Sequence, residues 1–299
     1  MSEFQFNAKN QNIQLIKENF TEDHCKGLAL KNKEKAFDIL TRTSSLFSQK
    51  EHIVLVKIEK RHRPFWNIKI ENYLEYKRQN NYKFNVEPEV RSVKINNKVF
   101  NITGQEPICN ITAEDHCVEH YKKHAIESAT DEELKDLKEY LTYESEGIKS
   151  LLELNTKKSK VFNPTIRASF LIRNILKEII KPFNADKIIQ EKIEVNELSL
   201  YLIPSYAFEF LNQKNNKRKV LEINSITGKI TKGPLIDESI TSMVSENLLF
   251  ELGAEIASFV IPGAGIGALL GKEIHSRKKK KEAIKKMRIS QAAATKNSV

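Results

Sequence analysis

The alternation of apolar and polar positions predicts an antiparallel meander in the first third of the chain. Residues 53–58 are rich in β-branched side chains, and residues 65–70 and 82–86 alternate apolar with polar positions, as half-buried strands do. Pro64 interrupts the pattern between the first two of these strands. A last pair of strands is expected within 90–102, on the two sides of an Asn-Asn turn.

Helical patterns precede and follow this meander. Residues 34–48 carry apolar side chains at approximately helical spacing. Two threonines, each followed three residues later by an acid, indicate helix starts and predict helices at about 113–127 and 131–153. A further helix is expected over 164–180, because its first proline is tolerated in a first turn and another proline follows its end.

A second β region comes after these helices. It covers 198–210 and 219–223 and ends in a tight turn. Both regions have the same order: a strand, a proline break, an alternating strand, a polar turn and another strand, with a helix upstream. This order indicates a duplicated helix-plus-meander unit. The alternative is that any two antiparallel meanders share such a pattern.

Taken together, these elements predict an α+β fold with two related helix-plus-antiparallel-meander units, a helical insertion and a C-terminal glycine-rich apolar helix or hairpin. The expected domains are an N-terminal segment (1–33), a first α+β unit (34–104), the helical insertion (105–160), a second α+β unit (161–236), and the glycine-rich apolar segment with its basic tail (237–299).

A short turn motif in the second unit carries a likeness to a known module. The helix 167–177 is followed by a strand pair, and Asn224-Ser225-Ile226-Thr227-Gly228 closes the turn. Over residues 166–232 the chain resembles the PepSY-type α+β module, with Asn224-Ser225 where that module often has Asp-Ala. The resemblance implies a binding or regulatory role and brings no catalytic residues.

The net charge of +10 is concentrated in the tail. Residues 272–299 hold ten Lys and Arg and two acids, so the preceding 271 residues carry only +2. A near-neutral body disfavours a nucleic-acid groove spread over the fold, because phosphate binding needs a concentrated positive field. We therefore expect no nucleic-acid partner, with a nucleic-acid-binding adaptor acting through the tail kept as an alternative.

Histidine and cysteine cluster at one place in the chain. On the expected helix, His116, His120 and His124 would share a face, flanked by Cys117, and imidazole and thiolate are good zinc ligands. The sequence has no second Cys-x-x-Cys or His-x-x-x-His pair that would complete a conventional zinc site. We expect no cofactor, and a zinc-binding enzyme or regulator built on these four residues is the alternative. A polar, solvent-facing helix would explain the same residues.

Enzyme signatures are missing from the sequence. It contains no dinucleotide-binding glycine motif after a strand, no Walker-type loop and no nucleophile elbow. We therefore predict no catalytic residues. Three cysteines do not form a disulfide framework, and the polar N-terminus has no apolar signal segment, so a cytoplasmic location is expected.

The last sixth of the chain has the pattern of a membrane-binding or self-associating element. Residues 252–271 hold one ionisable side chain and approach the roughly 20 residues that cross a bilayer. Gly263, Gly267 and Gly271 recur at intervals of four and would allow close helix contact. Gly253 and Ala257 continue this spacing upstream with partial fidelity. A cluster of cations that would bind anionic lipid follows; it consists of Arg277, Lys278, Lys279, Lys280 and Lys281.

The predicted function follows from this segment. We expect a non-enzymatic protein at the cytoplasmic face of a membrane, whose body binds a protein partner or signal and whose C-terminal segment inserts, anchors or oligomerises. That layout fits a bacterial stress, toxin or phage-defence effector, by analogy of architecture. The alternatives are a core hairpin of a soluble protein and a nuclear-localisation or nucleic-acid-binding tail.

Overall fold

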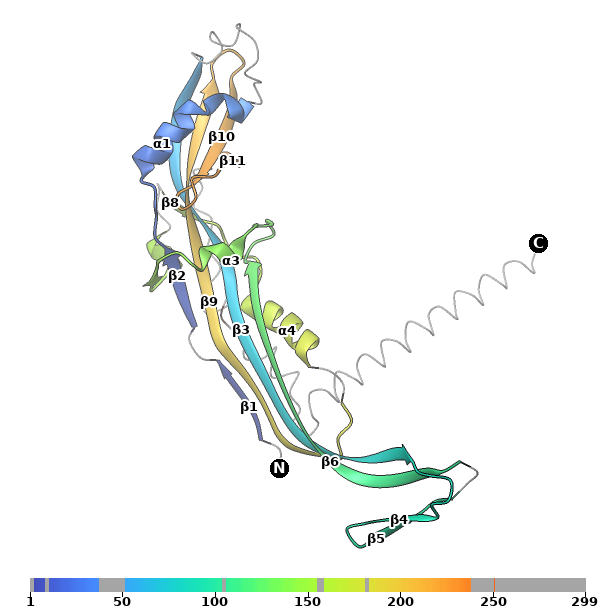
Figure 1. Ribbon diagram of the computed structural model, residues 1–299. Helices are drawn as coiled ribbons and strands as arrows, with labels where there is room; N and C mark the ends of the chain where they lie inside the picture. The colour runs from blue at the N-terminus through green and yellow to red at the C-terminus, as the bar shows by residue number, and fades with distance from the viewer. Residues whose placement is uncertain are drawn as a thin grey trace, which may run out of the picture.

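The computed structural model describes 3–8 (backbone only), 11–37, 52–103, 106–154, 159–180, 183–237 and Phe250. Three long strands dominate it: β3 (Ile53–Asn85), β6 (Ile108–Ser128) and β9 (Lys187–Asn212). The 33 residues of β3 would span about 110 Å if straight. Figure 1 shows the three strands running side by side as a long curved blade.

β3 is the centre of this blade. It pairs antiparallel with β9 from Ile53↔Asn212 to Lys77↔Lys187, and with β6 from Phe65↔Ser128 to Asn85↔Ile108. Shorter strands extend the nine-stranded sheet, and β1 and β2 pair parallel with β9. These strands are β1 (Glu3–Ala8), β2 (Gln11–Ile16), β7 (Ser145–Ile148), β8 (Ser159–Val161), β10 (Lys217–Asn224) and β11 (Ile230–Gly233).

Helices cover only parts of the sheet. Within the described ranges there are three α-helices and two short 3₁₀ turns: α1 (Glu22–Lys31), η1 (Lys33–Phe37), α3 (Leu137–Tyr140), η3 (Leu151–Glu153) and α4 (Ala168–Ile179). Thr21 caps α1 by accepting a hydrogen bond from the His24 amide. In Figure 1, α1 lies across the end of the sheet formed by β9 and β10, and α4 lies alongside β3 and β6.

The main core lies between α4 and the middle of the sheet. The apolar stripe of α4 buries side chains such as Ile172 and Leu176 against alternate residues of β3, of which Trp66, Ile68 and Ile70 are at most 1% exposed. A second core lies under α1, where Phe208 and Phe210 of β9 are buried. We call the end of the sheet that carries α1, β10 and β11 the head.

The expectation of an α+β fold with several helices is wrong, because the described chain is dominated by one large mixed sheet. The helix expected at 113–127 is wrong, because these residues make up most of β6. The segment 131–153 contains only α3, β7 and η3. The helix expected over 164–180 is present as α4. Of 34–48, the structure describes only the part that forms η1.

The two expected α+β units contribute to one sheet. β3 comes from the range 34–104 and β9 from the range 161–236, and these two strands pair over most of the length of β9. The internal repeat and the domain boundaries stay predictions, since strand pairing alone tests neither.

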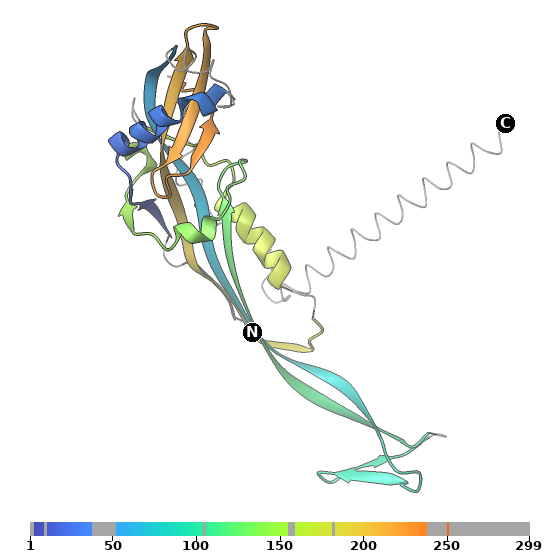
Figure 2. The same cartoon turned by 45° about the horizontal axis from the view of Figure 1, so that its top comes forward.

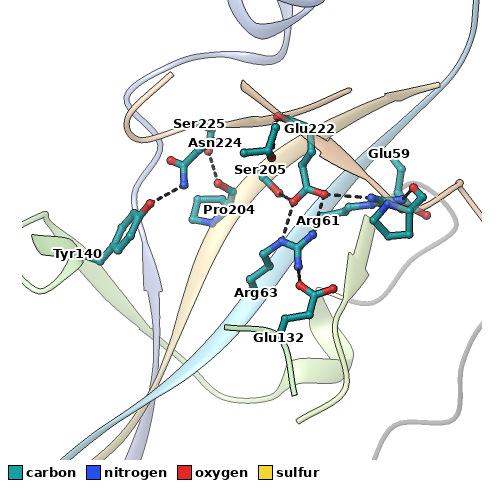
Figure 3. Close-up of polar contacts among 12 residues, drawn as sticks. Glu59, Arg61, Arg63, Glu132, Tyr140, Pro204, Ser205, Glu222, Asn224 and Ser225 are labelled. Carbon is teal, nitrogen blue, oxygen red and sulfur yellow. Dashed lines mark hydrogen bonds and ion pairs between the residues drawn. The ribbon is translucent and has the colours of Figure 1, made fainter. Parts of the chain in front are cut away.

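A buried ion network joins β3 to β10 in the head. Arg61 is 1% exposed; its Nε donates to Glu59 and its Nη1 to Glu222, at 2.7 and 3.1 Å. Arg63 and the Ser205 hydroxyl also donate to the Glu222 carboxylate (Figure 3). Burial would raise the pKa of Glu222, but hydrogen bonds and charges from the two arginines outweigh it and lower the pKa.

His62, which lies between these two arginines in the sequence, is a buried titratable side chain. Its side chain is 1% exposed, and its Nε2 has no hydrogen-bond partner in the described part of the chain. Burial, with the charge of Lys60, lowers the pKa of His62 to about 4. The folded protein therefore keeps this imidazole neutral down to a pH at which the unfolded chain, with its ordinary pKa near 6.5, has already bound a proton.

We expect His62 to make the protein less stable as the pH falls from about 6.5 towards 5. The loss should be about 2 kcal/mol over this window, because the unfolded state binds one more proton there than the folded state. Urea unfolding at several pH values measures it. The variant His62→Leu should lose much less stability over the same window; equal pH slopes in the two proteins would show that His62 is not responsible.

Candidate partner-binding arm

The β3–β6 pair extends beyond the rest of the sheet. β9 ends its pairing with β3 at Lys77. From Arg78 to Asn85, β6 (residues 108–115) is the only strand beside β3 among the described residues. Figure 2 shows this two-stranded ribbon projecting away from the body. We call residues 78–115 the arm; residues 104 and 105 within it lie outside the described ranges.

Cross-strand polar contacts hold the base of the arm. Arg78 Nε and Asn80 Nδ2 each donate to Asp115 Oδ2 at 3.1 Å, and the Tyr82 hydroxyl donates to Asp115 Oδ1. The hydrogen bond from Tyr82, helped by those from Arg78 and Asn80, lowers the pKa of Asp115. These four side chains lie on one face of the ribbon, so they join its two strands where no packed layer covers it.

The far end of the arm is a second, small hairpin. β4 (Ser92–Ile95) and β5 (Lys98–Asn101) form a separate two-stranded sheet, as the pattern around the Asn-Asn turn predicted. Asn96 and Asn97 have φ of 43° and 66°, the left-handed region that asparagine tolerates and that two-residue hairpin turns require. The hairpin lies against the end of the ribbon, and Cys109 is fully buried there.

Apolar side chains are exposed on the arm. Among the described residues, ten large hydrophobic side chains are exposed, and four of them are on the arm: Tyr82, Phe84, Ile95 and Val99. Val99 is the most exposed of the four, at 59%. Scattered exposed hydrophobics are normal in any protein, but several on one projecting element indicate a contact surface.

The arm has no net charge and has open edges. It contains five basic and five acidic residues. In the described chain, β6 pairs with β3 alone, so the backbone groups on its outer edge are unpaired, and residues 108–113 of this edge carry no charge. Proteins usually protect such edges with charged residues or cover them, because an open edge pairs with other strands.

The structure places the predicted zinc ligands on β6 beside the arm. His116, His120 and His124 share one face of the strand, because four residues is an even spacing, but neighbours among them are about 13 Å apart along it. Cys117 points to the other face. The histidines instead contact β3: His116 Nε2 lies 2.7 Å from Glu75 Oε1, His120 Nε2 3.1 Å from Glu71 Oε2, and His124 Nε2 2.6 Å from Asn67 Oδ1.

The four residues are therefore not brought to one point. Among the residues with described positions, no group of three His, Cys, Asp or Glu side chains could hold a metal ion. Burial, with the charge of the nearby Lys69, lowers the pKa of His124. Zinc binding stays a prediction that these contacts do not support.

The predicted membrane segment lies in the part of the chain that the structure does not describe. Gly253, Ala257, Gly263, Gly267 and Gly271, together with the cation cluster 277–281, lie outside the described residues. None of the helices in the described ranges has the length and hydrophobicity needed to traverse a bilayer.

Sequence reasoning missed both the arm's exposure and the ion network of the head. The network did leave a signal in the sequence: Glu59, Arg61 and Arg63 occupy alternate positions of one strand, so they share one face. Their partner Glu222 is about 160 residues away and could not be identified from spacing.

Comparison with known proteins leaves the PepSY-type resemblance as an expectation. No protein family, no curated protein and no solved structure matches this chain.

Proposed function

We propose that this is a non-enzymatic, self-assembling protein that acts at a membrane. In this proposal the arm binds a second copy of the chain, and the C-terminal segment brings the assembly to the cytoplasmic face of a membrane. The observation that carries the proposal is the arm itself: a two-stranded ribbon with open edges and four exposed large hydrophobic side chains, projecting beyond every other element.

Stability considerations support a contact at the arm. A two-stranded ribbon is at best marginally stable in water on its own and needs a further strand or a packed layer. Between Arg78 and Asn85 the described chain supplies no further strand, and only the small β4–β5 hairpin packs against the far end of the ribbon. A strand from another molecule, added to the outer edge of β6, would supply the missing backbone hydrogen bonds, and the exposed side chains would be buried at the same time.

A second copy of the chain is the partner that fits the charges. Identical surfaces repel one another when they carry a net charge, and the arm carries five charges of each sign. A nucleic acid or an anionic lipid surface would instead need a strongly positive face. A symmetric pair of arms would also bury the same apolar side chains from both molecules.

The association should weaken when the exposed side chains of the arm are made polar. In the full chain, Phe84→Ser with Val99→Ser is expected to raise the dissociation constant of the assembly at least about tenfold, because the contact would lose a few kcal/mol of apolar burial. Sedimentation velocity over a range of protein concentrations measures this.

The matched control carries the same number of changes outside the arm. Leu152 and Phe170 are 67% and 52% exposed, and their replacement by serine should leave the dissociation constant unchanged. The proposal fails if the arm variant associates like the unmodified protein. It also fails if the unmodified protein is monomeric, or if only Gly263→Val with Gly267→Val dissolves the assembly.

Membrane binding should depend on the cation cluster. With Arg277 to Lys281 all changed to glutamine, we expect at least tenfold weaker binding to vesicles that contain phosphatidylserine, since each cation near an anionic surface contributes about 1 kcal/mol. Vesicle flotation measures this, with phosphatidylcholine vesicles as the control. Equal flotation of the two proteins would contradict the membrane part of the proposal.

A further inference from the structure

A cavity opens beside the ion network of the head. Its volume of about 510 Å³ lies within the range of small-ligand sites. Four cations and three carboxylates line it, so its net charge is one positive, and the side chains of Leu134, Ile203 and Tyr140 add an apolar wall. The cations are Arg63, Lys135, Lys229 and Lys232, and the carboxylates are Glu132, Glu133 and Glu222.

Arg63 is fixed at the border of this cavity. Its Nε and Nη2 donate to the two oxygens of Glu222 at 2.8 and 2.9 Å, a two-pronged pair that fixes the plane of the guanidinium. The Phe162 ring stacks on the same group, with Arg63 Cζ 4.3 Å from the ring centroid. Because these contacts occupy one side of the guanidinium, Nη1 is the nitrogen that Glu222 leaves open to a group in the cavity.

Glu132 occupies that donor in this structure. Its carboxylate contacts Arg63 Nη1 on the side opposite Glu222 (Figure 3). Glu132 is half exposed, lies in the segment between β6 and α3 that forms neither helix nor strand, and has no other polar contact with a described residue. Since half-exposed ion pairs contribute little to stability, another carboxylate can replace this one readily.

We propose that the cavity binds a carboxylate-bearing peptide segment, and that Glu132 holds the place of the peptide carboxylate when the cavity is empty. The bound carboxylate accepts from Arg63 Nη1, and the apolar wall contacts a neighbouring side chain of the peptide. Lys135 and Lys229 form no ion pair with any residue in the described part of the chain, so their ammonium groups are free to attract the peptide.

The charge of the cavity favours a single carboxylate over a phosphate chain. With Glu132 displaced, four cations face two carboxylates, a net charge of two positive. One carboxylate is attracted to this field, whereas successive phosphates would approach Glu133 and Glu222 with like charge. Arg63 also presents a directional donor of the kind that recognises a carboxylate oxygen.

Calorimetric titration of the full chain with short peptides tests this inference. The probes are acetyl-Leu-Glu-Leu-amide, its Gln counterpart, and acetyl-Leu-Leu with a free carboxylate, which separate a side-chain from a C-terminal carboxylate. We expect the variant Glu132→Gln to bind a carboxylate peptide at least about tenfold more tightly than the unmodified protein does. If the ligand is a side-chain carboxylate, the peptide that contains Gln should bind at least about tenfold more weakly than the peptide that contains Glu.

Glu133→Gln is the matched control, because it removes the same charge from the cavity without freeing Arg63. Glu133→Gln should change the affinity for the carboxylate peptide by less than about threefold. A triple variant that adds Lys135→Gln and Lys229→Gln to Glu132→Gln should bind this peptide at least about tenfold more weakly than Glu132→Gln alone. An equal gain in the Glu132 and Glu133 variants would overturn the role of Glu132. No binding of either carboxylate peptide to Glu132→Gln at about 1 mM would overturn the site itself.

Discussion

Replacing Glu222 with alanine is expected to lower the free energy of unfolding by about 3–5 kcal/mol. The carboxylate is 3% exposed and receives hydrogen bonds from both Arg61 and Arg63, in a position where solvent cannot take its place. Its removal leaves Arg61 with Glu59 as its single carboxylate partner and leaves Arg63 without its two-pronged pair. Urea unfolding followed by circular dichroism measures the loss.

The matched control is an ion pair at the surface. Glu144 also accepts a hydrogen bond from a cation, Lys17, but its side chain is 74% exposed. Glu144→Ala should therefore produce no measurable change in Tm. Glu222→Gln, which keeps the shape and removes the charge, should lie between the two. If Glu222→Ala is as stable as Glu144→Ala, the ion network does not hold β3 to β10.

The second large effect is expected at Trp66, in the core between α4 and the sheet. Trp66→Ala should cost about 3–5 kcal/mol of folding free energy. The ring is fully buried, its Nε1 donates to the Ile166 carbonyl at 2.8 Å just before α4, and Phe250 packs edge-on against it. Since Trp66 is the single tryptophan of the chain, unfolding has to be followed by circular dichroism.

A conservative variant separates the ring from its hydrogen bond. Trp66→Phe keeps most of the apolar contact but leaves the Ile166 carbonyl without this donor, so a loss of about 1–3 kcal/mol is expected. A loss below about 1 kcal/mol for Trp66→Ala would mean that α4 is not anchored to β3 through this side chain.

Several strands could be predicted because their period is local. The segments 53–58, 65–70 and 82–86 all lie in β3, yet the expected break at Pro64 is absent. The outer neighbour of β3 changes at this point, since pairing with β8 ends at His62 and pairing with β6 begins at Phe65. A residue without an N–H is tolerated there because its missing donor falls in the gap between two partner strands.

β6 was mistaken for a helix because its pattern fits both periods. Residues four apart share a face on a helix and also on a strand. The spacing of His116, His120 and His124 is therefore compatible with both structures. The Thr–Asp spacing that indicates a helix start occurs within the strand as well. What decides the outcome is pairing with β3, a contact between distant segments that no local pattern contains.

The candidate sites were harder to predict than the strands. Alternation at 82–86 indicates a half-buried strand, and only the structure shows that no layer covers Tyr82 and Phe84. The head cavity depends on Arg63, Glu132 and Glu222, which come from three distant parts of the chain. The residue types alone do not indicate a cavity, because arginine and glutamate are typical of a solvated surface.

Hydrogen exchange of the unmodified full chain, measured in dilute and in concentrated solution, tests the self-assembly of the arm most directly. If two arms pair along the outer edge of β6, amides of the arm, including those of residues 108–113, exchange more slowly as the concentration rises, while those of α1 do not change. Exchange over residues 78–115 that is equally fast at every concentration, in a protein that nevertheless associates, would contradict the proposal.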